Sequence, residues 1–173
     1  MLLKKSTIYV FGIVFYIFLL VQGAIAQEVT VELVQNFTSV TPTYLSGHEG
    51  EVSMISGFSY QSDLLYEGIP IGTASGEILL SDPPFNPSVS FNDITIDGVW
   101  LFPGAGTINF TGSGIIFAGR TWLRTGELAI SLMGRYSEGT DVFSDYNGVG
   151  AGIGIVSLFT RQGSANITLY IQP

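Results

Sequence analysis

The sequence contains no cysteine, a single histidine and few charged residues. Without cysteine the chain has no disulfide scaffold, no thiolate nucleophile and no cysteine-ligated metal. His48 alone cannot build a multi-histidine metal site, and it is the one histidine available for a Ser-His-Asp triad. Only 12% of the 173 residues are charged, against about 25% in an ordinary globular chain. Several enzyme classes are thereby excluded, and no metal or other cofactor is expected.

Basic residues are also scarce, and two of the six lie at the N-terminus. Lys4 and Lys5 precede an almost continuous apolar run over 8–21, and Ala-Ile-Ala at 24–26 matches a small-residue cleavage site. The run is shorter than the roughly 20 residues that a spanning helix needs. We therefore predict a cleaved signal peptide over 1–26, a single domain over 27–173, and a secreted or periplasmic protein.

The predicted mature chain has no lysine, so four arginines stand against fourteen acids, for a net charge of −10. Such a chain lacks the cations that neutralise phosphate groups in nucleic acids or that adsorb to anionic lipid. Neither nucleic acid nor a membrane surface is therefore an expected partner.

Apolar and polar residues alternate along the chain with a period of two, which is typical of half-buried strands. The turn-rich segments between these runs contain Gly, Pro, Asn and Asp, and no ten-residue stretch carries a helical stripe. About eight short strands predict an all-β domain, either a closed antiparallel barrel of the calycin-like kind or a sandwich. We prefer the closed barrel because closure removes the sheet edges. The runs cover 28–37, 52–60, 71–80, 88–96, 106–118, 128–132, 149–160 and 167–171.

Glycine is abundant, with 22 residues, and several occupy one parity of a predicted strand. The clearest case is Gly148, Gly150, Gly152 and Gly154, which leaves one face of that strand nearly bare. Repeated glycine in a strand indicates close approach of other groups at a barrel bend, or room left for a ligand. Both interpretations remain open at this point.

Three segments resemble the allene oxide cyclase and dirigent barrel superfamily. Residues 58–76 (FSYQSDLLYEGIPIGTASG) are similar to its early strand pair, with an aromatic strand, a D-x-L turn and a G-x-x-x-G strand. Residues 100–108 (WLFPGAGTI) resemble a strand carrying G-x-I, and 128–134 with 146–150 resemble its later glycine-rich segment. The chain departs from the pattern at 137–145, where a longer acidic loop replaces a tight glycine turn.

This resemblance implies an eight-stranded antiparallel barrel, often a homo-trimer, although a homo-dimer is also open. It further implies a lumen that takes up an apolar small molecule and guides cyclisation or radical coupling. Holding a flexible reactant in one conformation lowers the entropic part of the barrier without a covalent catalyst. A cofactor-free cyclase or isomerase is therefore the enzymatic activity to test.

The candidate catalytic residues are Asp63, Tyr66 and Glu67, at the D-x-L turn. Carboxylates at a barrel mouth act as acid or base when burial raises their pKa, but an aspartate in a turn also caps its own backbone. Asp93 and Asp97 share one strand face, and a position on the solvent face is preferred for both.

The candidate ligand-binding residues are Arg120, Trp122, Arg124, Tyr60 and Trp100. The two arginines and Trp122 have one parity, so a strand would place them together, where they could clamp a carboxylate. The alternative is a pair at the rim that neutralises acids. The aromatic rings either line a cavity or form ordinary core.

Two other functions remain open. A small outer-membrane barrel also combines a signal peptide with dyad alternation, although Glu28 and Glu32 interrupt an apolar band on the first strand. A secreted structural or adhesive β-protein without a ligand is the second.

Overall fold

The computed structural model describes residues 29–45, 54–86, 88, 91–119 and 122–172. The predicted signal peptide, His48 and Arg120 lie outside the described residues.

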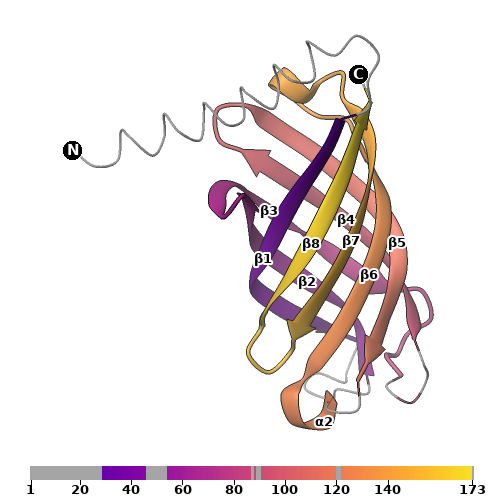
Figure 1. The fold of residues 1–173 in the computed structure, drawn as a ribbon. Coiled ribbons are helices and arrows are strands. Elements are labelled where there is room, and N and C mark those ends of the chain that lie inside the picture. The colour runs from indigo at the N-terminus through magenta and orange to yellow at the C-terminus, as the bar shows by residue number, and fades with distance from the viewer. Residues whose placement is uncertain (1–28, 46–53, 87, 89–90, 120–121, 173) are drawn as a thin grey trace.

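Eight antiparallel strands, each hydrogen-bonded to its neighbours in sequence, close into a barrel when β8 pairs with β1 (Figure 1). The prediction of a closed eight-stranded barrel is confirmed. A single helical turn, α2, and a short 3₁₀ turn, η2, lie in two of the connections. The elements are β1 (Val29–Tyr44), β2 (Ile55–Tyr66), β3 (Ile69–Leu80), β4 (Asn92–Phe102), β5 (Gly106–Ala118), α2 (Trp122–Thr125), β6 (Glu127–Ser137), η2 (Asp141–Phe143), β7 (Asn147–Ser157) and β8 (Gln162–Gln172).

The strands alternate between the lumen and the outer surface. On β4, for example, every second residue from Ile94 to Phe102 is buried, and the residues between them are exposed. The lumen is mostly apolar, while the outward residues are mainly Thr, Ser, Asn and acidic side chains, apart from scattered exposed apolar residues and the outward Val149, Ile153 and Ile155 of β7. An outer-membrane barrel has the reverse pattern, with an apolar band outside and a polar interior. The side-chain distribution therefore does not support that alternative. The described residues contain no helix long and apolar enough to cross a membrane.

Several strands are longer than the periodicity predicted. β1 extends to Tyr44 and β2 to Tyr66, beyond the predicted runs 28–37 and 52–60. The fourth strand begins at Asn92 rather than at 88. Backbone pairing in a closed sheet continues past the point where apolar alternation weakens, because every strand has a hydrogen-bonded neighbour along each of its two edges.

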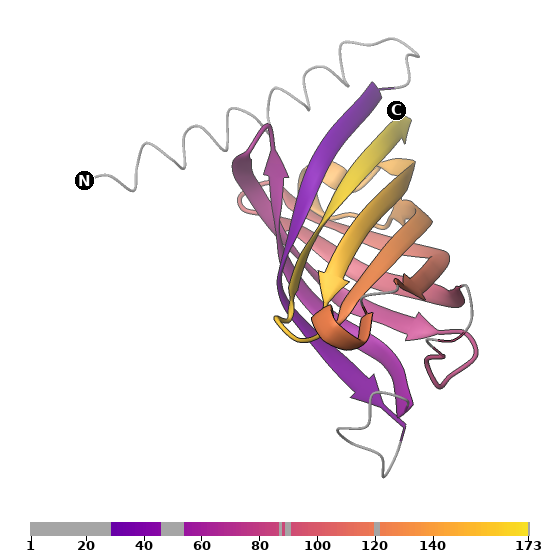
Figure 2. The ribbon, with the colours of Figure 1, turned by 60° about the horizontal axis from the view of Figure 1, so that its bottom comes forward.

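We call the two ends of the barrel upper and lower, as they lie in Figure 1. Figure 2 shows the lower end coming forward. Each of three connections at this end contributes a buried side chain. Phe85 and Trp122 meet edge to face, with ring centroids 5.4 Å apart, and Leu158 is buried beside them in the core. Backbone bonds hold these connections in place, from Phe85 N–H to the Ile55 carbonyl (2.7 Å) and from Leu158 N–H to the Gly126 carbonyl (3.0 Å).

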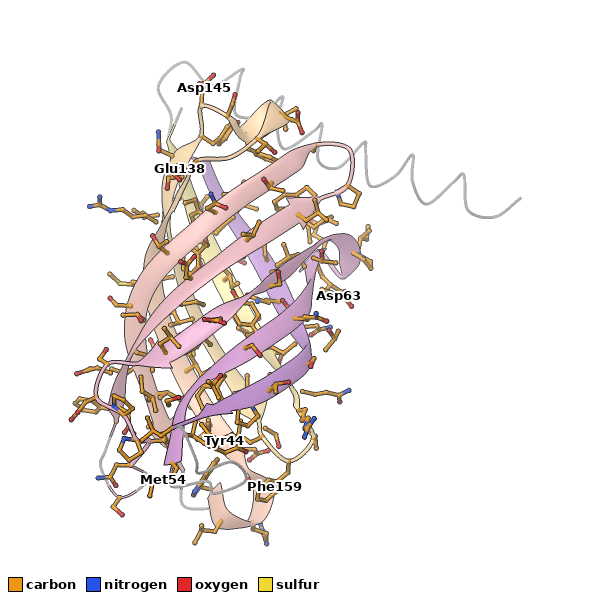
Figure 3. All side chains as sticks on the ribbon, turned by 180° about the vertical axis from the view of Figure 1, so that it is seen from behind. Tyr44, Met54, Asp63, Glu138, Asp145 and Phe159 are labelled. Carbon is orange, nitrogen blue, oxygen red and sulfur yellow. The ribbon has the colours of Figure 1, made fainter. Side chains whose placement is uncertain are left out.

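The upper end is partly covered by the connection between β6 and β7. Phe143 packs on Phe102 with ring centroids 5.1 Å apart, and Tyr146 packs on Phe143 at 5.9 Å. Thr140 fastens the connection to β5, because its hydroxyl accepts a 3.0 Å hydrogen bond from the Thr107 N–H. Figure 3 shows the acidic Glu138 and Asp145 of this connection at the upper end.

Candidate functional site: the lumen and a side opening

A small polar cluster interrupts the apolar lumen. Gln35 on β1 donates a 2.8 Å hydrogen bond from Nε2 to Oγ of Ser62 on β2. Ser62 in turn donates to the Ala74 carbonyl on β3, at 3.3 Å. Tyr60 also interacts with Gln35 through a side-chain hydrogen bond. Because buried polar groups need partners, this network fixes the Gln35 amide and the Tyr60 hydroxyl inside the barrel.

Two tyrosines of the lumen are held in their neutral form. Burial raises the pKa of Tyr60 to about 12, although the hydrogen bond with Gln35 opposes the shift, and the charge of Asp97 adds slightly to it. Burial also raises the pKa of Tyr136, and the neighbouring Tyr60 adds to that shift. Both phenols therefore keep their protons at neutral pH, as hydrogen-bond donors rather than as bases.

A cavity of about 20 Å³ lies among these groups, which is room for roughly one water molecule. One side is lined by large rings, including Tyr60, Trp100 and Tyr136, and the other by small residues of β7 and β8, including Gly152 and Ala165. The lumen is thus filled mainly by its own side chains. The sequence predicted a pocket for a larger apolar molecule, and no such open pocket lies among these lumen side chains.

Most of the inward glycines make room for these rings or for neighbouring backbone. A Cβ at Gly150 would lie 2.5 Å from the Tyr136 hydroxyl oxygen, and one at Gly76 would lie 2.9 Å from the Tyr60 hydroxyl oxygen. Gly134 is similarly blocked by the Phe110 ring. Close packing is therefore the right interpretation for these positions. Gly152 is the exception, because a Cβ there would make only ordinary contacts at 3.5 and 3.6 Å.

A larger groove opens where β1 runs past the end of β2. Pairing of β1 with β2 begins at Val34 and Leu65, whereas β1 pairs with β8 from Val29 onward. The groove has a volume of about 640 Å³ and is lined by this part of β1, the β2–β3 hairpin and Ile167 with its neighbours on β8. Ile167 also lines the inner cavity. The groove and the inner cavity are therefore neighbours, because Ile167 lines both of them.

The candidate catalytic residues lie at or near this side opening. Tyr66 and Glu67 line the groove, and Glu67 adopts a positive φ of 50° in the hairpin turn. Asp63 is exposed on the outward face of β2, away from the polar cluster (Figure 3). Asp93 and Asp97 are exposed as well, so their preferred position on the solvent face is confirmed. The catalytic roles of Asp63, Tyr66 and Glu67 stay predictions.

The candidate ligand-binding residues separate into two groups. Tyr60 and Trp100 are buried in the core and line the inner cavity, and their ligand-binding roles stay predictions. Trp122 and Arg124 belong to the helical turn α2 at the lower end, so their expected common strand face is wrong. Two residues apart in a helix they point in different directions; Trp122 is buried and Arg124 is exposed. The Trp122 Nε1 has no hydrogen-bond partner among the described residues.

Sequence reasoning missed Gln35 and Ser62 as parts of the lumen. Gln35 has the inward parity of Leu33 and Phe37, and Ser62 that of Tyr60 and Leu64. A polar residue on an otherwise apolar parity was therefore a visible signal. No group of three or more metal-ligating side chains occurs over the stretches that the structure describes.

The fold and its site define an up-and-down barrel with an aromatic lumen, a buried polar cluster and a side opening. No family model matches the sequence, and no curated protein matches it. Among solved structures, the barrel is similar to a protein described as a nonspecific heme-binding cyclase that catalyses a 4 + 2 cycloaddition during neoabyssomicin biosynthesis. The identity is 14%, the TM-score is 0.49, and the match covers 84% of this chain and 64% of that protein.

Proposed function

We propose that the barrel binds a neutral, largely apolar small molecule, with one polar group of that molecule held by the buried cluster. The observation that carries this proposal is a hydrogen-bonded set, Gln35, Tyr60 and Ser62, inside a lumen that is otherwise apolar. Buried polar groups in a core lower stability unless they are satisfied, and such groups placed in an apolar cavity orient ligands.

The chemistry of the cluster suits a carbonyl or hydroxyl group of the ligand. Neutral Tyr60 and Tyr136 can donate hydrogen bonds to an oxygen on which negative charge develops, and this stabilisation is strong in a water-excluded site. If the bound molecule is a flexible polyene or phenol, holding it in one conformation favours cyclisation or isomerisation. Such a reaction forms bonds within the substrate and needs no co-reactant from the protein.

Binding requires side chains of the lumen to move, because the cavity of about 20 Å³ is smaller than any such ligand. We infer that the molecule enters by the groove beside β1, whose volume of about 640 Å³ falls in the range of small-molecule sites. Glu32 and Glu67 line this groove. Their negative charge disfavours an anionic ligand, so the proposal specifies a neutral one.

The test measures quenching of Trp100 fluorescence in a Trp122→Phe variant, so that one indole reports from the lumen. The probes are methyl linoleate and linoleate. We expect saturable quenching by the ester and weaker binding of the acid. Gln35→Leu should weaken ester binding by about 1 kcal/mol, the usual contribution of one neutral hydrogen bond.

The matched control is Gln61→Leu, because Gln61 is exposed on β2 and should leave binding unchanged. No saturable quenching by either probe would contradict the proposal. Tighter binding of the acid than of the ester would contradict the preference for a neutral ligand.

A secreted structural protein without a ligand is the second candidate, and one observation favours it. Large rings fill the lumen, so the polar cluster then serves only to specify the packing of the core. In that case neither probe quenches Trp100, and Gln35→Leu changes stability alone.

A further inference from the structure

Charge is distributed unevenly around the outside of the barrel. The outward faces of β1 to β4 carry the exposed acids Glu32, Asp63, Glu77, Asp93 and Asp97 and no basic residue. On β5 to β8 the strands carry only two charged residues, Glu127 and Arg135, both exposed and both on β6. The second half of the wall is therefore nearly free of charge.

The same half carries an exposed apolar ridge. Met133 on β6 and Ile153 on β7 are each 70% exposed, and Ile155 is 55% and Val149 48% exposed. On β7 the glycines point into the lumen and these branched side chains point out, so that strand is more apolar outside than inside. Exposed apolar residues also occur on β1 to β4, but Val34, Leu79 and Val99 each follow an acid two residues earlier on the same face.

The two charges of this half lie at opposite ends of β6. Glu127 is at the lower end and Arg135 eight residues above it, with the same parity, which corresponds to about 27 Å along the strand. Neither side chain forms an ion pair within the described part of the chain. The midpoint between them is Ser131, whose partner across the β6–β7 ladder is Ile153.

The connections at the two ends extend this arrangement. The upper connection beside Arg135 carries Glu138, Asp141 and Asp145, while the two lower connections next to this face, β5–β6 and β7–β8, carry Arg124 and Arg161; Asp82 lies on the lower β3–β4 connection, outside this face. Turning a second copy of the barrel upside down against this face would bring acidic upper loops to basic lower turns.

We propose that this face, formed by β6 and β7 with the edges of β5 and β8, binds a second copy of the chain about a twofold axis near Ser131 and Ile153. In a twofold contact, if one residue of the first copy touches a second residue of the other copy, the same pair also touches with the two copies exchanged. Glu127 of each copy then meets Arg135 of the other, and the two ridges pack across the axis. A net charge of −8 for each chain opposes contact through β1 to β4.

The size of the face sets the expected affinity. It measures about 27 Å along β6 and about 14 Å across the four strands, so about 380 Å² on each copy, which is below the range of stable interfaces and in the range of weak, transient ones. The dimer is therefore expected to be weak, with a dissociation constant of about 100 μM.

The test measures the mass of the particle that the full chain forms in solution, by sedimentation velocity. Dividing this mass by the mass of one chain from mass spectrometry gives the number of copies. The ratio is expected to rise from near one at about 1 μM toward two as the concentration approaches about 1 mM. Ile153→Glu places two like charges near the axis and should give a monomer. Val99→Glu, which adds the same charge at an exposed apolar position of β4, should leave the dimer intact.

Charge reversal tests the twofold geometry. Glu127→Arg and Arg135→Glu should each weaken the dimer about tenfold or more, because two attractive contacts become repulsive. The double variant should restore it. A monomeric or trimeric wild type, equal dissociation by Val99→Glu, or no recovery in the double variant would overturn the proposal. None of these outcomes depends on whether the lumen binds a ligand.

Discussion

The two halves of the barrel wall, β1 to β4 and β5 to β8, enclose one lumen but differ in which side chains they place inside and outside. Strands β1 to β4 place large apolar side chains inside, such as Phe58 and Trp100, and acids outside. Strand β7, in the other half, places glycine inside and isoleucine outside. The Tyr136 ring of β6 occupies the space that Gly150 of β7 leaves.

This difference separates packing from surface function. A side chain on the inner face must fit the rings opposite it, so its size is dictated by the core. No such requirement explains exposed isoleucine on β7, since a polar residue there would fit the strand equally well. The apolar ridge is therefore the part of the wall that the proposed dimer would bury, and the acidic half is the part that would stay exposed in it.

The largest expected effect tests whether the two halves share one core. Trp100 on β4 packs against Phe110 on β5 and Tyr136 on β6, at ring centroid distances of 6.3 and 5.1 Å. Trp100→Ala should lower the free energy of unfolding by about 3–5 kcal/mol. Urea denaturation should keep a single transition, whereas two transitions would show that the halves unfold separately. Val99→Ala, on the outer face of the same strand, should change stability by less than about 0.5 kcal/mol.

The second effect concerns pH and the lumen side of β2. Because the pKa of Tyr60 rises to about 12 in the folded barrel, the unfolded chain loses this proton first as the pH rises. Stability is full below pH 10 and falls between pH 10 and about 12, by about 3 kcal/mol for this group. Tyr60→Phe should make that fall shallower. Urea titrations at pH 8 and pH 11 would measure it, and an unchanged slope would contradict the burial of the phenol.

The third effect compares two glycines of β7. Tyr136 is packed between Trp100 and Phe110, so it cannot yield to a methyl group at Gly150. Gly150→Ala should therefore cost about 1–3 kcal/mol. Gly152→Ala, whose Cβ has room, should be neutral or stabilising by up to about 1 kcal/mol. Equal losses at both positions would show that chain conformation, not the rings, requires glycine.

The smallest effect lies on the acidic half. Glu77 and Asp97 are directly opposite on β3 and β4, and both are exposed. Like charges in this position oppose each other, so Glu77→Gln should stabilise the barrel by about 0.2–1 kcal/mol. The gain should shrink at high salt, where exposed charges are screened. Thermal unfolding with and without 1 M NaCl would show it.

Much of the barrel could be predicted because alternation is local. The parity of Val31 and Leu33, or of Ile94 and Ile96, is visible in the chain and is the parity that the lumen uses. The same rule failed at Trp122 and Arg124, because a helical turn replaces the strand there and changes which side chains share a face. Four residues are too few for a helical period to be recognised.

The sequence by itself determined the all-β class, about eight strands and the inward parity of Tyr60, since these follow from a period of two and from turn chemistry, and it favoured closure over a sandwich because closure removes the sheet edges. Only the tertiary structure decided that the bare face of β7 receives the Tyr136 ring at Gly150 and Ala165 with its neighbouring backbone at Gly154, and leaves room for a methyl group at Gly152. It also decided that β1 overruns β2 to leave a groove, and that acids and exposed isoleucines fall on opposite halves of the wall. These outcomes depend on register and on which strands face one another across the lumen, and neither is encoded in any single strand.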